Sequence, residues 1–379
     1  MIDKRSFTLE WIESFKKKSE YRHIQTNILE KMIYSLYLVE LLKNKGLNFV
    51  FKGGTSLVLL IEEDNRFSID VDIICNQKRN VLEKTFEEIV EDSIFVSFAL
   101  DEKRSYKPGI PKAHYIFEYV SKVNPKFKSS ILLDILDEEV LYPEVINRPV
   151  STRWISNKGL SLISLPSVDS ITGDKLTAFA PNTIGIPYYK GKNSFGMEIC
   201  KQLFDLSRLF IKITDIKVVA DSFYRFAKRE IQYRRILDNS FDILPQAALL
   251  DTISTCVIIS KRDANKIEPD KSNFRLIQDG IKSLNSGYLM SGNFRLDDAI
   301  NASAKIAYLA SKVLSDDLSD LGFYEKDDVS ELIIQDPKWN FLNKLKKLQD
   351  KSTFFYWYHA YKILVEMDYE FFKQIERKK

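Results

Sequence analysis

Two glycines and two aspartates stand close together in the segment 49–74, which reads FVFKGGTSLVLLIEEDNRFSIDVDII. Asp70 and Asp72 are two residues apart in an alternating run that is typical of a strand. Their carboxylates therefore share one face, while the apolar residues beside them point to a core. Adjacent carboxylates make each other costlier to ionise, and a divalent cation between them removes that cost. Because Mg²⁺ prefers one or two carboxylates together with substrate phosphates, the pair predicts a magnesium site.

The glycines come just before this pair and complement it. Gly53 and Gly54 let the backbone turn sharply and approach a ligand closely. A helix that starts here directs its free N–H groups at an anion, and we expect Thr55 or Ser56 to cap it. A surface turn followed by an edge strand with two solvated acids is the alternative explanation. The order strand, Gly-Gly turn, helix and acidic strand favours phosphoryl or nucleotidyl transfer instead.

The elements that must position these residues are predicted from periodicity and turn residues. Helices are expected over 5–18 and 21–46, and Gly46 ends the second one. Further along the chain we expect strand 48–52, helix 55–62, strand 69–75, helix 80–94 and strands 95–100, 114–120 and 131–136. After Pro166, apolar residues recur at helical spacing.

The predicted fold class is therefore α+β. Residues 1–160 are expected to form a mixed sheet flanked by helices, with helices at the N-terminus. Residues 161–379 are expected to form a mostly α-helical domain.

Composition favours an intracellular globular protein. Of the 379 residues, 45% are hydrophobic and 29% are charged, which is ordinary for a globular chain. No apolar run approaches the ~20 residues that span a membrane. The three cysteines show no paired spacing and are expected to be buried thiols in a reducing compartment. We therefore expect a cytoplasmic protein that does not enter a membrane.

The net charge of +3 does not by itself predict nucleic-acid binding. Two local groups are candidates, because basic groups pair with phosphates and tyrosines stack on bases. They are Lys228, Arg229, Arg234 and Arg235 with Tyr224 and Tyr233, and Lys190 and Lys192 with Tyr188 and Tyr189. For each group taken singly, a solvated face or loop is the favoured explanation.

Three motifs, taken together, resemble the AbiEii/AbiGii family of nucleotidyltransferase-fold toxins, which includes the MenT-type toxins. The first motif consists of Gly53, Gly54, Thr55 and Leu57, followed by Arg66, Phe67, Ser68, Asp70 and Asp72. The second lies in 167–179 around Asp174-Lys175, and the third in 201–206 around Asp205. The motifs occur in family order within about residues 30–212.

The resemblance implies a polymerase-β-like nucleotidyltransferase core and the role of a toxin in a bacterial toxin–antitoxin or abortive-infection system. A cognate antitoxin is then expected to be encoded nearby. The resemblance also implies one or two Mg²⁺ ions, a nucleoside triphosphate as substrate, and tRNA or another RNA as acceptor. A nucleotidyltransferase that modifies a small molecule or a protein is an alternative, and so is an inert nucleotide-binding partner protein.

In such folds a third acid on a neighbouring strand joins the Asp70 and Asp72 pair. Asp134 matches that position, because it interrupts the apolar run 131–136. A carboxylate there is costly unless it meets a metal, a base or a hydrogen-bond donor. Asp137 is the alternative third acid.

The resemblance assigns the remaining roles. Lys175 is expected to contact a phosphate as a point charge, and Asp205 is expected to orient Lys175 or the base of the nucleotide. The turn from Gly53 to Ser56 is expected to hold the β- and γ-phosphates. Ser68 shares a face with Asp70, so its phosphorylation is expected to block the site electrostatically.

Overall fold

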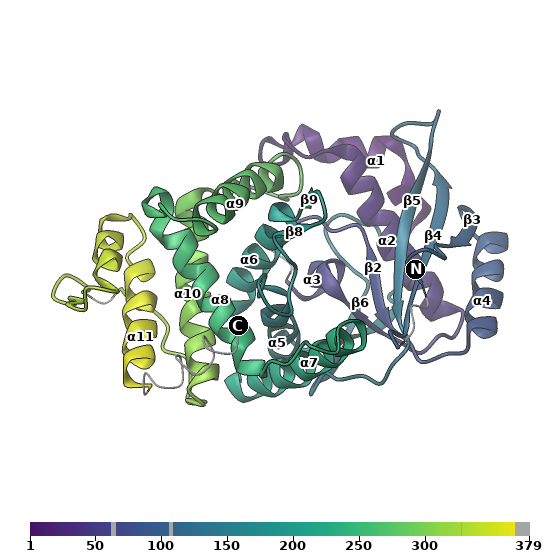
Figure 1. The fold of residues 1–379 in the computed structure, drawn as a ribbon. Helices are drawn as coiled ribbons and strands as arrows, with labels where there is room; N and C mark the ends of the chain where they lie inside the picture. Colours follow the sequence, from purple (N-terminus) through teal and green to yellow (C-terminus); the bar gives the residue numbers. More distant parts are fainter. Residues whose placement is uncertain (62–65, 106–108, 327, 368–379) are drawn as a thin grey trace. The chain divides into compact units, whose positions relative to one another are not determined.

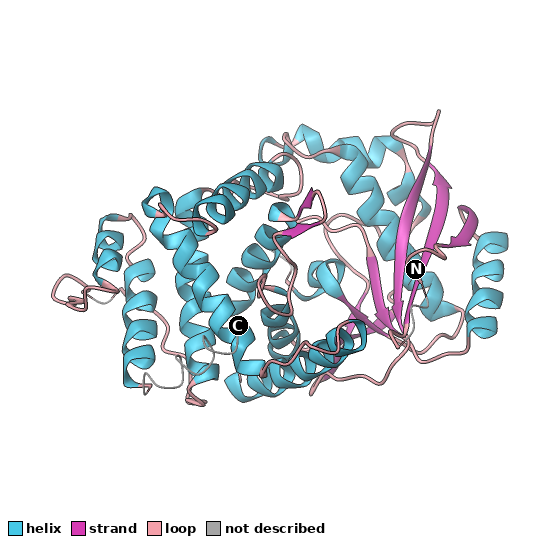
Figure 2. Cartoon of the chain, viewed as in Figure 1, coloured by secondary structure: helices cyan, strands magenta, loops and turns pink. Residues whose placement is uncertain are grey.

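A computed structural model of the protein describes residues 1–61, 66–105, 109–326 and 328–367. Strands gather in one part of the chain and helices make up nearly all of the other (Figure 2). The predicted α+β fold class is therefore confirmed.

Two compact units make up the chain. The first consists of Met1–Ser167 and Ser286–Asn293, and the second of Val168–Asn285 and Phe294–Lys379. Whereas the sequence predicted a first domain of residues 1–160, the contacts extend the first unit to Ser167. The short segment Ser286–Asn293 also belongs to the first unit, although it lies in the sequence between two helices of the second unit.

A five-stranded mixed sheet is the framework of the first unit, with the order β1-β2-β5-β4-β3. Its strands are β1 (Val50–Lys52), β2 (Val71–Ile74), β3 (Phe95–Leu100), β4 (Lys112–Val120) and β5 (Lys128–Leu136). β2 and β5 run parallel, and the other neighbours are antiparallel. Alternate residues of β4 and β5 are buried, so one face of the sheet enters the core and the other is partly exposed.

Helices cover the buried face of this sheet (Figure 1). They are α2 (Thr26–Asn44) and α4 (Arg79–Asp92), and the unit also contains α1 (Leu9–Ser14) and α3 (Gly53–Leu60). α2 packs through Tyr34, whose ring stacks on that of Tyr119 at 3.7 Å between centroids. α4 packs through Phe86, whose ring meets those of Tyr115 and Phe117 at 4.9 and 5.2 Å. Such ring pairs add to the free energy of apolar burial and hold the sheet in place.

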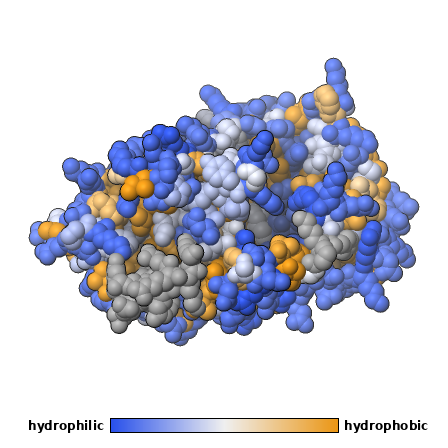
Figure 3. All heavy atoms as spheres, viewed as in Figure 1, coloured by the Kyte–Doolittle hydropathy of each residue, from blue (hydrophilic) through white to orange (hydrophobic). Residues whose placement is uncertain are grey.

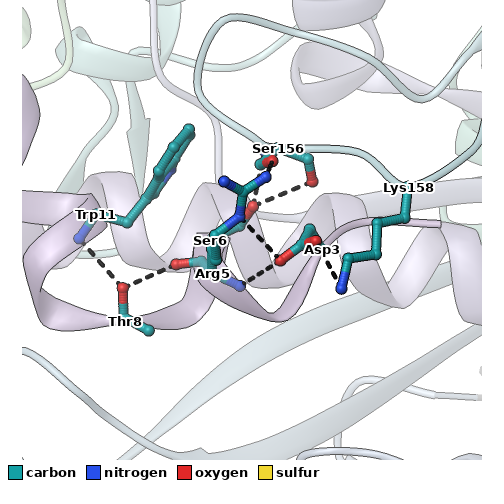
Figure 4. A network of polar contacts seen from close by, with 7 residues as sticks. All are labelled: Asp3, Arg5, Ser6, Thr8, Trp11, Ser156 and Lys158. Carbon is teal, nitrogen blue, oxygen red and sulfur yellow. Dashed lines mark hydrogen bonds and ion pairs between the residues drawn. The ribbon is translucent and has the colours of Figure 1, made fainter.

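Polar contacts tie the N-terminal segment to the connection between β6 (Val145–Pro149) and β7 (Leu162–Pro166), an antiparallel pair. Asp3 accepts a hydrogen bond from the backbone N–H of Arg5 at 2.9 Å and pairs with Lys158 at 3.0 Å (Figure 4). Arg5 donates to the hydroxyl of Ser156 at 2.9 Å. The backbone N–H of Arg5, and after it Lys158, holds the pKa of Asp3 below its usual value.

Helices dominate the second unit. They are α5 (Val168–Ala178), α6 (Gly196–Phe210), α7 (Ile216–Leu237), α8 (Pro245–Lys261), α9 (Asp270–Asn285), α10 (Leu296–Leu314) and α11 (Ser352–Glu366), with a hairpin of β8 (Tyr189–Lys190) and β9 (Asn193–Ser194). α6 and α9 approach closely because Gly196 and Gly280 face each other, and a Cβ on either would enter the neighbouring helix. All three cysteines are buried and free, as predicted, and burial raises the pKa of Cys75 to about 11.

Local elements depart from the predictions near Thr8 and before Pro166. The expected helix over 5–18 is broken into η1 (Lys4–Phe7), α1 and η2 (Phe15–Lys17), because Thr8 has extended backbone and accepts an N–H as the cap of α1. The strands β6 and β7 were not predicted. The helix expected over 55–62 is α3, which starts at Gly53; residue 62 lies outside the described residues.

In the part of the chain that the structure describes, no helix is both long and apolar enough to cross a membrane. The face seen in Figure 3 is mostly hydrophilic, and its apolar residues form small separate groups.

Candidate functional site

The Gly-Gly turn and the acidic strand lie directly against each other. Gly53 has φ +75°, a conformation that L side chains rarely adopt. A Cβ placed on Gly53 would run into the carboxylate of Asp72. The predicted phosphate-holding turn and one of the predicted metal ligands therefore meet in the structure, and glycine is required there for space as well as for φ.

The hydroxyls that follow the glycines serve a different purpose from the one predicted. Thr55 is buried and donates to the backbone carbonyl of Asp70 at 2.6 Å. Ser56 is buried and donates to the carbonyl of Gly53 at 2.8 Å. The prediction that one of them caps α3 is wrong, because the helix already starts at Gly53, its N-cap residue is Lys52, and no side chain caps it. Thr55 instead fixes the distance between the turn and Asp70.

Gly54 is crowded from the other side by two side chains of the loop before β2. A Cβ on Gly54 would lie 2.7 Å from the hydroxyl oxygen of Ser68 and 2.8 Å from a guanidinium nitrogen of Arg66. Ser68 is half-buried, and Arg66 is only 4% exposed. The structure thus places Ser68 at the turn, and it adds Arg66. Arg66 was part of the matching motif but was not predicted as a site residue.

Asp70 and Asp72 differ in exposure. Asp70 precedes β2 and is exposed, whereas Asp72 is half-buried within the strand. Val71 and Ile73 are buried on the opposite face, as the alternation predicted.

A row of ionisable residues crosses the partly exposed face of the sheet at the level of Asp72. The strand register places Lys52 opposite Asp72, Asp72 opposite Asp134, and Asp134 opposite His114. Asp134 therefore stands beside Asp72, whereas the alternative third acid, Asp137, follows the end of β5. Lys52 and His114 could have been found from the sequence only by knowing the register.

The carboxylate of Asp134 already has cationic and hydrogen-bonding neighbours. Its Oδ1 lies 2.6 Å from Nδ1 of His114, and its Oδ2 lies 3.6 Å from a guanidinium nitrogen of Arg104. A carboxylate in this apolar run was expected to need a metal, a base or a hydrogen-bond donor. His114 is such a partner of Asp134, and Arg104 stands beside it.

Among the described residues, no group of three or more His, Cys, Asp or Glu side chains is arranged to hold a metal ion. In the predicted arrangement a metal would take the two carboxylates of Asp70 and Asp72 and complete its shell with substrate phosphate oxygens, which is the donor set that Mg²⁺ prefers. Because the carboxylate of Asp72 lies against Gly53, a cation held by this carboxylate would stand beside the turn that is predicted to hold phosphates. The role of Asp134 as a further ligand stays a prediction.

In the second unit, the structure brings Lys175 and Asp205 together. Lys175 on α5 donates to Asp205 on α6 at 2.7 Å and to the amide oxygen of Gln202 at 3.1 Å. Both side chains are almost fully buried, at 7% and 0% exposure. The predicted orientation of Lys175 by Asp205 is therefore geometrically present; the contribution of this pair to the acidic site of the first unit stays a prediction.

Breaking this buried pair is expected to destabilise the second unit strongly. Asp205→Ala leaves the Lys175 charge buried, which typically costs about 3–5 kcal/mol. Asp221→Ala on α7 is the control, because Asp221 pairs with Arg225 at the same 2.7 Å and both side chains are about half exposed, at 46% and 48%. We expect a cost nearer about 1 kcal/mol there. Urea unfolding measures both, and equal losses of stability would contradict the special position of the Lys175 pair.

The two basic groups differ in their exposure. Arg234 is half-buried and donates to the carbonyls of Ile184 and Gly185 at 2.6 and 3.1 Å, so it holds the chain before β8 in place. Lys190 and Lys192 are exposed on the β8–β9 hairpin, as expected for a solvated loop.

Comparison with known proteins bears directly on this arrangement. Residues 37–274 match the model of the family described as nucleotidyl transferase AbiEii toxin, type IV TA system. This match covers the Gly-Gly turn, the acidic strand, Lys175 and Asp205, and it confirms the resemblance drawn from the three motifs. No curated protein matches the chain.

Two solved structures are similar at low identity. One is a protein of H. pylori described as a nucleotidyltransferase, with 20% identity, a TM-score of 0.33, and coverage of 68% of this chain and 96% of that chain. The other is MenT4, the nucleotidyltransferase toxin Rv2826c of Mycobacterium tuberculosis H37Rv, with 14% identity, a TM-score of 0.43, and coverage of 78% and 97%. At these scores the likenesses add nothing to the family match.

Proposed function

The chain belongs to the AbiEii family of nucleotidyltransferase toxins of type IV toxin–antitoxin systems, and from this premise we propose that it is a Mg²⁺-dependent enzyme that transfers a nucleoside monophosphate from a nucleoside triphosphate to tRNA. In this proposal the protein acts in the cytoplasm, arrests growth as part of phage defence, and is countered by an antitoxin encoded nearby.

The observation that carries the proposal is the contact between the Gly-Gly turn and the acidic strand. The carboxylate of Asp72 lies where a Cβ on Gly53 would be, and the hydroxyl of Thr55 donates to the backbone carbonyl of Asp70. A turn that can accept phosphates and carboxylates that can hold a cation are thus fixed relative to each other within one short segment. Transfer chemistry needs this combination, whereas an inert binding protein does not.

In the proposed mechanism the residues of the chain bind and orient the donor. The backbone from Gly53 to Ser56 holds the β- and γ-phosphates, and Arg66, buried beside Gly54, adds positive charge to that turn. Asp70 and Asp72 would hold Mg²⁺, which when bound neutralises the charge that develops as pyrophosphate leaves. We propose that Lys175, held by Asp205, contributes a further positive charge to a phosphate.

A labelling assay tests the proposal. The purified protein is incubated with total tRNA, Mg²⁺ and each of the α-³²P-labelled nucleoside triphosphates in turn. We expect label on tRNA with one of the triphosphates, and none when EDTA removes the metal. Label on a protein or a small molecule, but not on RNA, would contradict the tRNA acceptor while keeping the nucleotidyltransferase activity.

Ser68 offers a point where negative charge is expected to silence the enzyme. Its hydroxyl lies at Gly54, so a carboxylate in its place repels both the triphosphate and the acids. Charges this close interact by several kcal/mol in a partly buried site, and we expect Ser68→Asp to reduce transfer on the order of a hundredfold. Ser68→Asn, which has the same shape without the charge, is expected to retain most activity. Full activity of Ser68→Asp in the labelling assay would refute this.

A further inference from the structure

His114 and Arg104 enclose an acid that stands next to the proposed metal ligands, and none of the three motifs contains either residue. His114 lies on β4 and Asp134 on β5, directly opposite each other, while Asp134 is also the register partner of Asp72 on the parallel strand β2. Facing pairs on neighbouring strands are close enough for their side chains to interact. Asp134 is thus placed between a like charge on one side and His114 on the other.

Hydrogen-bond geometry fixes the direction of the Asp134 carboxylate. A carboxylate oxygen accepts, so Nδ1 of His114 is the donor in the 2.6 Å contact with Oδ1. Arg104, from the turn after β3, stands 3.6 Å from Oδ2. The two side chains of the hydrogen-bonded pair are 15% and 29% exposed, so the pair is sheltered from water much more than a surface ion pair is.

We propose that His114 is a positioning residue of the nucleotidyltransferase site, which holds the Asp134 carboxylate in one orientation beside Asp72. Without this bond the carboxylate rotates about its χ2 torsion, which has broad minima, and Arg104 alone does not define a single orientation. Groups that orient a carboxylate or ligand at a metal site typically change affinity or activity by about 10- to 100-fold when they are removed. The inference rests on the proposed function, because it concerns the same site.

Substitutions at His114 separate the hydrogen bond from the shape of the side chain. Asparagine carries an N–H donor at the δ position, as histidine does at Nδ1, whereas leucine has nearly the shape of asparagine and no donor. We expect His114→Leu to lower kcat by about 10- to 100-fold with little change in KM for the triphosphate. His114→Asn is expected to recover most of this loss.

Glu118→Leu is the matched control. Glu118 lies on the same face of β4, half-exposed, and also has hydrogen-bonding partners on its neighbours, namely Ser97 at 2.7 Å and Lys128 at 3.0 Å. It is remote in register from the row through Asp72, so we expect its replacement to leave transfer unchanged. Equal activity of His114→Leu and Glu118→Leu would overturn the proposal, and so would full activity of Asp134→Asn.

A spectroscopic measurement tests the pair without reference to activity. The chain has only three histidines, His23, His114 and His359, so the imidazole ¹⁵N resonances of the labelled protein can be assigned by substitution. We expect a tautomer with the proton on Nδ1 for His114, and a change in its resonances alone in Asp134→Asn. Unchanged His114 resonances in that variant would show that the pair does not form.

The outcomes of these experiments distinguish failure of the positioning role of His114 from failure of the proposed function. If the wild-type protein transfers nucleotide and Asp72→Asn does not, the function stands, and equal activity of His114→Leu and Glu118→Leu overturns only the positioning role. If the wild-type protein labels no acceptor, the proposed function fails, and the inference fails with it even where the imidazole resonances still show the pair.

Discussion

Replacement of Asp72 by asparagine is expected to reduce nucleotidyl transfer on the order of a thousandfold or more and to relieve growth arrest on expression. Asp72 is the half-buried acid whose carboxylate fills the space that Gly53 leaves open. A bound cation stabilises the charge of the transition state by several kcal/mol, and each 1.36 kcal/mol corresponds to about a tenfold change in rate. The labelling assay and a colony-formation assay measure the two effects.

Asparagine keeps the shape of Asp72, so the variant is expected to fold. Glu118→Gln is the control, since it removes one half-exposed carboxylate from the same face of the sheet, on β4, and is expected to keep full activity. Asp70→Asn should resemble Asp72→Asn. An Asp72→Asn protein that retains more than about a tenth of the wild-type rate would exclude Asp72 as an essential ligand.

Local spacing was sufficient to predict the arrangement of the candidate site within one short segment. The two-residue period of a strand places Asp72 on one face and the buried Val71 and Ile73 on the other. The Gly-Gly turn before it follows from residue type alone. For the same reason the alternation in β5 singled out Asp134 within an apolar run.

Pairing between distant strands could not be predicted in this way. His114 meets Asp134 only because β4 and β5 pair in one register, and a shift by one residue would turn each side chain to the other face. No local pattern in the sequence predicts that Ser286–Asn293 belongs to the first unit either. There the N–H of Phe67 donates to the carbonyl of Tyr288 at 2.6 Å, so the loop before β2 is held by a segment far away in the sequence.

Alanine at Gly53 is expected to abolish transfer nearly as completely as the loss of Asp72, although Gly53 contributes no side chain. Two costs combine at this position. The backbone has φ +75°, which costs an L-residue about 1–2 kcal/mol, and the new methyl group would occupy the place of the Asp72 carboxylate. The carboxylate must move, or the turn must open, and either change separates the predicted phosphate site from the predicted metal ligand.

Gly46→Ala isolates the first cost, that of the backbone conformation. Gly46 has φ +87°, and a Cβ there meets no atom within 4 Å, so alanine at this position loses stability only through the backbone conformation. We therefore expect Gly53→Ala to lose more stability than Gly46→Ala in urea unfolding, and only Gly53→Ala to lose transfer, by about a hundredfold or more. A Gly53→Ala protein that is as active as Gly46→Ala would mean that the contact between the turn and Asp72 is not needed for catalysis. The phosphate-holding role would then have to be assigned to another part of the chain, even if Asp72 itself proved essential.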